Sequence, residues 1–219
     1  MRAEQIAELI AGFPNLRARH PLGVWRQDAR ARFSIRASTE CLAHAAQLGV
    51  SVTPLPRVRR HGLPIPTPVR VDSAIGGVVF RKEREGAPLI VSCEMVARMH
   101  TLAQTLSHHG VREVEVLSAF RLEPRTSFHT MGLALDLHTF HRGSDAWVVA
   151  RDWVMRPGEP TCQSLDASDT SAGMQLRALA CELAESGDYS TVLTPEYDAD
   201  HFDHLHLDIR PEDTRVFCR

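Results

Sequence analysis

Two short stretches of the chain alternate leucine with ionisable residues, and this alternation constrains the fold more than any other feature. The stretch 132–140 reads GLALDLHTF, and the stretch 201–208 reads HFDHLHLD. A β-strand sends successive side chains to opposite faces, so the leucines of each stretch share one face and the ionisable residues share the other. We therefore expect two strands, each with a core face and a chemical face.

The chemical faces of these strands carry the residue types of a metal site. His204 and His206 point to the same side of the later strand, Asp136 projects from the earlier one, and His129 stands in a loop seven residues before Asp136. Neutral imidazole and carboxylate are common zinc ligands, and a loop histidine can curl back toward the strand that follows it. The four residues are predicted to meet at one ion. The alternative is a buried polar network without metal, in which several buried groups would need other partners.

The remaining pattern indicates an α+β domain with a central antiparallel sheet and flanking helices. Apolar residues at helical spacing, with capping residues, predict helices at 38–49, 92–110 and 171–187. Further strands are expected at 111–121 and 190–194, and a proline-rich connection with little regular structure at 53–68. We assign residues 1–36 to an N-terminal helical extension and residues 37–219 to the main domain.

Composition excludes several classes of protein. The chain has 219 residues, 43% of them hydrophobic, which is enough to bury a full core. A formal charge of -2 gives no general attraction to nucleic acid, and no apolar stretch approaches the ~18 residues of a membrane span. The first residues show no signal peptide. Five cysteines without a CxxC pair argue against a cysteine zinc site, and their odd number leaves at least one unpaired within the chain: Cys41, Cys93, Cys162, Cys181 and Cys218.

Two longer motifs carry a resemblance to a known family. The segments SFHTMGLALDLHTF and VLTPEYDADHFDHLHLDIR resemble the signatures SxHxxGxAxD and HxDHxHxD of the extensin-like C-terminal domain family, over roughly residues 40–219. That family is similar to the LAS metallopeptidases, which include lysostaphin-type enzymes, D-Ala-D-Ala metallopeptidases and the hedgehog signalling domain. These proteins share a histidine, an aspartate seven residues later, and a His-x-His on an antiparallel sheet. The resemblance implies a LAS metallopeptidase or hedgehog-like fold.

The resemblance also implies roles for individual residues. His129, Asp136 and His206 would bind one zinc ion per chain and leave room for a water, which the ion acidifies. Asp203, three residues before His206, would act as the general base, although it is shorter than the glutamate of many relatives. His204 would stabilise an oxyanion or shuttle protons.

Arg121 ends the segment SAFR, which resembles the SGYR motif of the D-Ala-D-Ala metallopeptidases. Its guanidinium would face the scissile carbonyl or a substrate carboxylate; a surface ion pair is the alternative. Pairing of the cysteines stays open between Cys181 with Cys218 and Cys162 with Cys181.

The function implied is a zinc-dependent peptidase or amidase that acts on peptidoglycan stem peptides or cross-links, in the periplasm or outside the cell. The alternative is a zinc-containing wall- or glycan-binding module with little or no catalysis, which the hedgehog-type domains show to be compatible with this fold. A third possibility is hydrolysis of another amide or ester in the wall. Asp203 separates the first two, because only an enzyme needs a base. The bond cleaved and the oligomeric state stay open.

Overall fold

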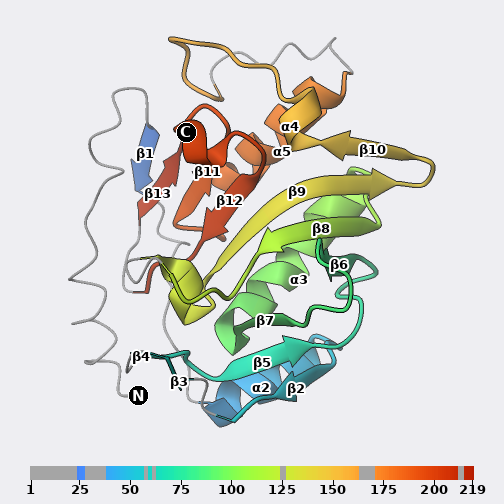
Figure 1. The fold of residues 1–219 in the computed structure, drawn as a ribbon, viewed down its shortest axis with the longest axis vertical. Coiled ribbons are helices and arrows are strands. Elements are labelled where there is room, and N and C mark those ends of the chain that lie inside the picture. Colours follow the sequence, from blue (N-terminus) through green and yellow to red (C-terminus); the bar gives the residue numbers. More distant parts are fainter. Residues whose placement is uncertain are drawn as a thin grey trace.

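One large sheet dominates the protein (Figure 1). The computed structural model describes residues 24–27, 38–56, 59–60, 63–123, 127–162, 171–211 and 215–219. Within them the sheet has the strand order β1-β13-β11-β12-β9-β8-β6, and β10 pairs with β9 off this path. In chain order the strands are β1 (Val24–Gln27), β6 (Val79–Lys82), β8 (Glu113–Ser118), β9 (Ala134–Arg142), β10 (Asp145–Val148), β11 (Thr191–Leu193), β12 (Leu205–Asp208) and β13 (Arg215–Cys218).

The sheet is mixed, although most of its pairings are antiparallel. The pairs β6–β8 and β11–β13 are parallel. A parallel pair needs a long crossover, and β6 reaches β8 through β7 (Leu89–Ser92) and α3 (Cys93–His108). The predicted combination of helices and sheet is confirmed, but the sheet is not purely antiparallel as expected.

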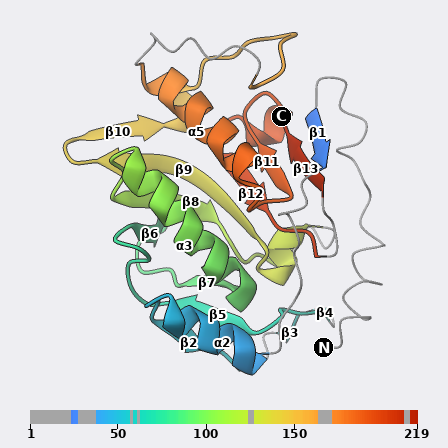
Figure 2. The same cartoon turned by 180° about the vertical axis from the view of Figure 1, so that it is seen from behind.

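Helices α3 and α5 (Ala172–Ser186) cover the same face of the large sheet, as both lie behind it in Figure 1 and in front of it in Figure 2. The reason is visible in α3, where Met95, Met99, Leu102 and Leu106 recur at helical spacing and are buried. Helix α5 ends at Ser186 and is followed by Gly187, whose positive φ of 74° closes the last turn. Ser92 stands at the N-cap of α3, but its hydroxyl donates to the Pro66 carbonyl (2.7 Å) instead of capping the helix.

Smaller elements surround this core. Strands β2 (Val52–Pro54) and β5 (Pro68–Val71) form a second sheet with β7, and the short strands β3 (Arg59–Arg60) and β4 (Leu63–Pro64) pair with each other. The proline-rich stretch 53–68 therefore holds more regular structure than expected. Helix α2 (Ser38–Gln47) is joined to α3 by the Cys41–Cys93 disulfide. After β10, the short helix α4 (Val149–Asp152) opens an irregular excursion, of which residues 153–162 are described.

Two further expectations meet the structure in part. Strand β1 lies within the predicted extension 1–36, and it pairs with β13 of the main domain. Residues 1–23 and 28–37 lie outside the described residues, so the division into extension and domain stays a prediction. The strand predicted over 201–208 covers only Leu205–Asp208.

A β-bulge between β8 and β9 decides which residues of β9 face the core. Val116 pairs with Leu137 but Val114 pairs with Phe140, so β9 carries one extra residue between the two pairs. Leu135 and Leu137 are fully buried by simple alternation, and the extra residue brings Phe140 to the same buried face. Asp136, which alternates with the leucines, points to the opposite face of the sheet.

Candidate metal centre

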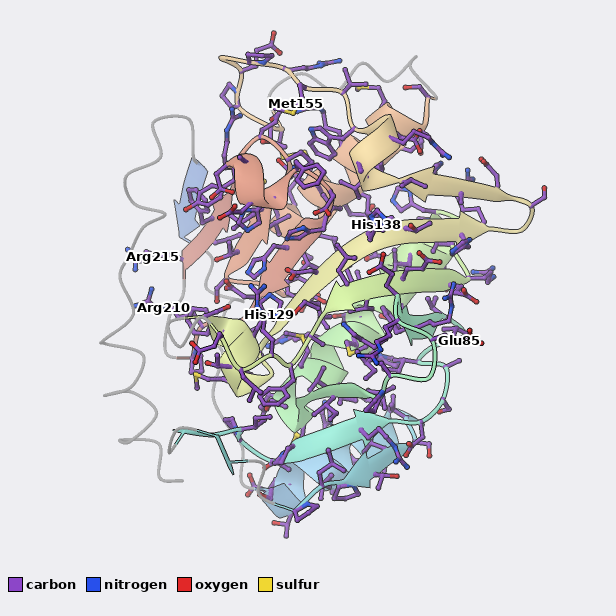
Figure 3. All side chains as sticks on the ribbon, viewed as in Figure 1. Glu85, His129, His138, Met155, Arg210 and Arg215 are labelled. Carbon is purple, nitrogen blue, oxygen red and sulfur yellow. A yellow bond between two sulfur atoms is a disulfide. The ribbon has the colours of Figure 1, made fainter. Side chains whose placement is uncertain are left out.

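Three elements bring His129, Asp136 and His206 together. His129 lies in a 3-10 turn (η2, Phe128–Met131), Asp136 in β9 and His206 in β12. Strands β9 and β12 are antiparallel, and their register sets His206 directly opposite Asp136. The turn η2 is shaped by Ser127, whose hydroxyl accepts from the His129 backbone N–H (3.3 Å). Figure 3 shows His129 on η2, at the end of the sheet where β9 begins.

The ligand atoms of these three residues are close enough to share one ion. Asp136 Oδ1 lies 3.0 Å from His129 Nε2 and 2.8 Å from His206 Nδ1, and the two nitrogens are 3.3 Å apart. Ligand atoms at 2.0–2.1 Å from a tetrahedral zinc ion lie about 3.3 Å from one another. The three side chains are 0%, 3% and 7% exposed in chain order. The separations and the donor types fit a zinc site with three protein ligands.

The proton positions at His129 also point to a cation. Its Nδ1 donates to the Ala119 carbonyl (2.6 Å), so a neutral ring carries a lone pair on Nε2, which faces the Asp136 carboxylate. Burial lowers the pKa of His129 and outweighs the effect of Asp136, so the neutral ring is favoured. Burial opposes ionisation of Asp136, but His129 and His206 hold its pKa well below the usual value. With a neutral His129 ring, its Nε2 lone pair and the Asp136 carboxylate face the same point, an arrangement that favours a cation there.

A second proton on His206 can supply that positive charge, and a metal ion bound to His206 could supply it instead. Its Nε2 lies 3.2 Å from Asp208 Oδ2 and its Nδ1 faces Asp136. Burial lowers the pKa of His206, but the hydrogen bonds to these two carboxylates raise it overall to about 9. Without an ion, His206 is thus doubly protonated at neutral pH. A metal ion would replace the Nδ1 proton and keep the Asp208 bond as the support of a ligand histidine.

His204 stands between two carboxylates at the edge of this cluster. It precedes β12 by one residue; its Nδ1 lies 2.7 Å from Asp203 Oδ1 and its Nε2 lies 3.4 Å from Asp136 Oδ1. Asp203 is therefore bonded to the far side of the His204 ring, and its own backbone carbonyl accepts from His138 Nδ1 (2.9 Å). The sequence-based prediction was that Asp203 acts directly on the metal-bound water as the general base.

Arg121 lies next to the cluster in the loop that follows β8. Its backbone N–H bonds to the His129 carbonyl (3.4 Å), and its positive charge contributes to the lowered pKa of His129. The side chain is exposed and makes no ion pair within the described residues. The structure thus brings Arg121 beside the cluster, and its guanidinium has no ion-pair partner in the part of the chain that the structure describes.

Two nearby residues were not among the metal-binding or catalytic residues predicted from the sequence. His201 lies in a second 3-10 turn (η3, Ala199–His201), with its ring centre 5.1 Å from that of His204 and 5.7 Å from that of His206. Its position in the same histidine-rich motif was the available signal. Lys82, at the end of β6, donates to the Leu117 carbonyl, and burial lowers its pKa despite the charge of Asp136. No local pattern marks this lysine.

A pocket of about 510 Å³ lies beside η3. Its lining includes Trp153, Met155, Asp198 and Phe202. Asp198 links the pocket to the cluster, because its Oδ1 lies 2.5 Å from His201 Nδ1. Met155 and Phe202 are 52% and 62% exposed, so the rim presents apolar surface beside the candidate site.

Fold and site together define a mixed α and β domain with a buried His-Asp-His cluster on a sheet face. The family model for the extensin-like protein C-terminus matches residues 39–219, and the chain belongs to this family. No curated protein and no solved structure shows significant similarity to the chain. Among the described residues, no helix has the length and apolar character needed to cross a membrane.

Proposed function

We propose that the protein is a zinc-dependent peptidase or amidase that acts on peptidoglycan stem peptides or cross-links. The observation that carries this proposal is the convergence of three buried ligand atoms, from His129, Asp136 and His206, beside a fourth side chain, His204, whose Nε2 faces the same point. The resemblance of the two motifs to those of the LAS metallopeptidases supports the same reading.

The ligands would be held by fixed neighbours. The Ala119 carbonyl orients His129, and the Asp208 carboxylate orients His206, so that each presents one nitrogen to the ion. A bound zinc ion supplies a water whose pKa is lowered to ~7 and polarises the substrate carbonyl. The burial of all three side chains keeps bulk water from competing for the ligands.

Proton transfer is best assigned to His204. Its Nε2 faces the cluster, while Asp203 accepts a hydrogen bond from Nδ1–H and balances the charge of a protonated ring. Asp203 then acts through His204 as a positioning residue, which is a different role from the direct base expected from the sequence. Arg121 is suited to bind the carbonyl or carboxylate oxygen of the substrate, because it is exposed next to His129.

Substrate class and location are part of the same proposal. The two disulfides, Cys41–Cys93 and Cys162–Cys181, support an oxidising compartment, which is where peptidoglycan is found.

The test is zinc content and hydrolysis measured on the same preparations. Zinc is counted per chain, and fragments released from intact peptidoglycan are identified by mass. We expect one tightly bound zinc in the wild type, and we expect His206→Ala to lose both the zinc and the hydrolysis. Asp203→Asn should keep the zinc and lose about 10²- to 10⁴-fold in rate. His44→Ala, in α2, serves as the control and should behave as the wild type. Full hydrolysis by His206→Ala would remove the proposal.

A wall-binding module without turnover is the second candidate, and the pocket beside η3 favours it. Its exposed rim residues, Met155 and Phe202, are suited to contact a polymer. In that case the protein should sediment with peptidoglycan without releasing fragments. Asp203→Asn should then leave binding unchanged, whereas Phe202→Ala should weaken it.

A further inference from the structure

A second group of potential ligands overlaps the first. Among the described residues, His201, His204 and His206 each offer a nitrogen, and these atoms lie within 4.8 Å of one another. His206 belongs to both groups, but His201 and His204 do not belong to the first. The histidine run therefore contains more ligand atoms than one ion with three protein ligands uses.

The hydrogen bonds of His201 and His204 engage Nδ1 of each ring and leave Nε2 as the candidate ligand, and His204 Nε2 lies 3.4 Å from Asp136 Oδ1, at the edge of the first group. His201 Nδ1 lies 2.5 Å from Asp198 Oδ1, and His204 Nδ1 lies 2.7 Å from Asp203 Oδ1. In both cases a carboxylate accepts a hydrogen bond from Nδ1–H, so the lone pair of the neutral ring is on Nε2. Metal-bound histidines are typically supported by a carboxylate in this way. The two rings are neighbours, with centres 5.1 Å apart.

These two histidines are also more open than the first group. Their side chains are 17% and 11% exposed, whereas that of His129 is fully buried. His206 cannot contribute equally to both groups, because its Nδ1 faces Asp136 and its Nε2 faces Asp208. An ion at this position would have two strong protein ligands and would complete its coordination with water. It should bind more weakly than an ion in the first group.

We propose that His201 and His204 form a second, weaker site for a divalent transition-metal ion such as Zn²⁺, at the edge of the first centre. The binding site itself is independent of any activity. Its consequence rests on the proposed function: an ion on His204 Nε2 removes the group that accepts the proton, so excess zinc inhibits hydrolysis.

Metal stoichiometry tests the site directly. The protein is dialysed against buffers of increasing free Zn²⁺, and zinc per chain is determined by elemental analysis. We expect the wild type to bind one ion at low free zinc and a second at higher free zinc. His201→Ala should lose the second ion only, and Asp198→Asn should weaken its binding about tenfold. His44→Ala is the matched control and should bind both.

Two results would overturn the site: a wild type that never binds more than one ion, or a His201→Ala protein that binds the second ion unchanged. His201→Gln provides a second variant of similar size if the alanine variant is unfolded by circular dichroism. The loss of the second ion in both variants, with the first retained, would support the proposal.

Hydrolysis across the same zinc series separates this inference from the proposed function. Wild-type activity should fall over the range in which the second ion binds. For His201→Ala, measured relative to its own rate at low zinc, the fall should need at least tenfold more free zinc. If the wild type binds two ions but never hydrolyses peptidoglycan, the proposed function fails and the site stands. If it hydrolyses and the zinc response is the same in both proteins, the inhibitory role fails.

Discussion

Each imidazole of the cluster has one nitrogen fixed by a neighbouring acceptor, and these acceptors decide what the other nitrogen can do. The acceptor for His129 is the Ala119 carbonyl, and the acceptor for His204 is Asp203. Alternation, the spacing of His129 from Asp136 and the resemblance of the two motifs to a known family together predicted that His129, Asp136 and His206 approach one another. They could not predict the acceptors, because the direction of the Ala119 carbonyl and the rotation of Asp203 toward His204 depend on loop conformations that no periodic pattern encodes.

Gly132 is the residue on which the position of His129 most depends. It follows η2 with a positive φ of 65°, and a Cβ there would lie 2.5 Å from the Ser92 backbone nitrogen. Gly143 has a similar φ of 63° but nothing within 4 Å of its Cβ position. Alanine substitutions at Gly132 and Gly143 therefore separate the free-energy cost of a positive φ from that of a backbone clash.

We predict that Gly143→Ala loses about 1 kcal/mol of unfolding free energy, from the positive φ alone. Gly132→Ala should lose more than about 3 kcal/mol, because the chain must move away from β7 as well. It should also bind zinc more weakly, since His129 moves with the turn. Urea denaturation and zinc titration of both variants check this, and equal losses would contradict it.

At the scale of elements, local turns and strand pairing explain why two strands differ from their predicted form. The strand predicted from residue 201 begins at Leu205 because the Asp198 side chain accepts from the Asp200 backbone N–H (3.0 Å) and starts the turn η3. That turn folds His201 back toward His204. The bulge in β9 likewise follows from its pairing with β8, which a single strand's pattern does not reveal.

A buried charge network fastens the excursion 153–162 to the core. Glu196 Oε1 accepts from Arg177 (2.6 Å) and from the Arg156 backbone N–H (2.8 Å), while Oε2 accepts from Thr161 (3.0 Å) and Arg219 (3.2 Å). The Glu196 side chain is fully buried. One carboxylate thus serves partners on α5, on the excursion and next to β13.

Glu196 should make stability depend on pH in acid. Burial would raise its pKa, but hydrogen bonds from Arg177 and Arg156 lower it overall. A carboxyl whose pKa is depressed by folding adds stability above its unfolded value of about 4.3, and this is lost as the pH falls through the folded value.

We predict that Glu196→Gln costs about 3–5 kcal/mol at pH 7, because two buried guanidinium groups lose their partner. The difference from wild type should shrink below about pH 4, where the native carboxyl takes up a proton. Urea denaturation between pH 7 and pH 3 measures both values. Glu113→Gln, which removes an exposed partner of Arg81, should cost less than about 1 kcal/mol throughout. A difference for Glu196→Gln that stays constant with pH would contradict the assignment.

At the scale of the whole molecule, the sequence indicated the mixture of helices and sheet and the family. It did not indicate the parallel pairs β6–β8 and β11–β13. These pairings join strands that are separated by helices or by other strands, and the periodicity of a segment says only which of its faces is buried. The cysteine pairs were undetermined for the same reason, since spacing alone does not show which sulfurs meet.

The structure resolves the cysteines into two disulfides and a buried thiol. Cys41 pairs with Cys93 and Cys162 pairs with Cys181, while Cys218 is buried with its sulfur 3.8 Å from that of Cys162. Of the two pairings left open by the sequence, the structure contains Cys162–Cys181. Burial raises the pKa of the Cys218 thiol to about 12, so it is protonated and unreactive at neutral pH.

We predict that iodoacetamide labels no cysteine of the folded protein and labels only Cys218 after unfolding without reductant. Because the Cys41–Cys93 bond spans 52 residues and the Cys162–Cys181 bond spans 19, replacing each pair with alanines should cost about 4 and about 3 kcal/mol, respectively, from the larger entropy of the unfolded chain. Peptide mapping locates the label, and urea denaturation gives the two losses. A label on Cys181 would show that Cys162 is bonded to Cys218, so that the excursion would be tied to β13 instead of α5.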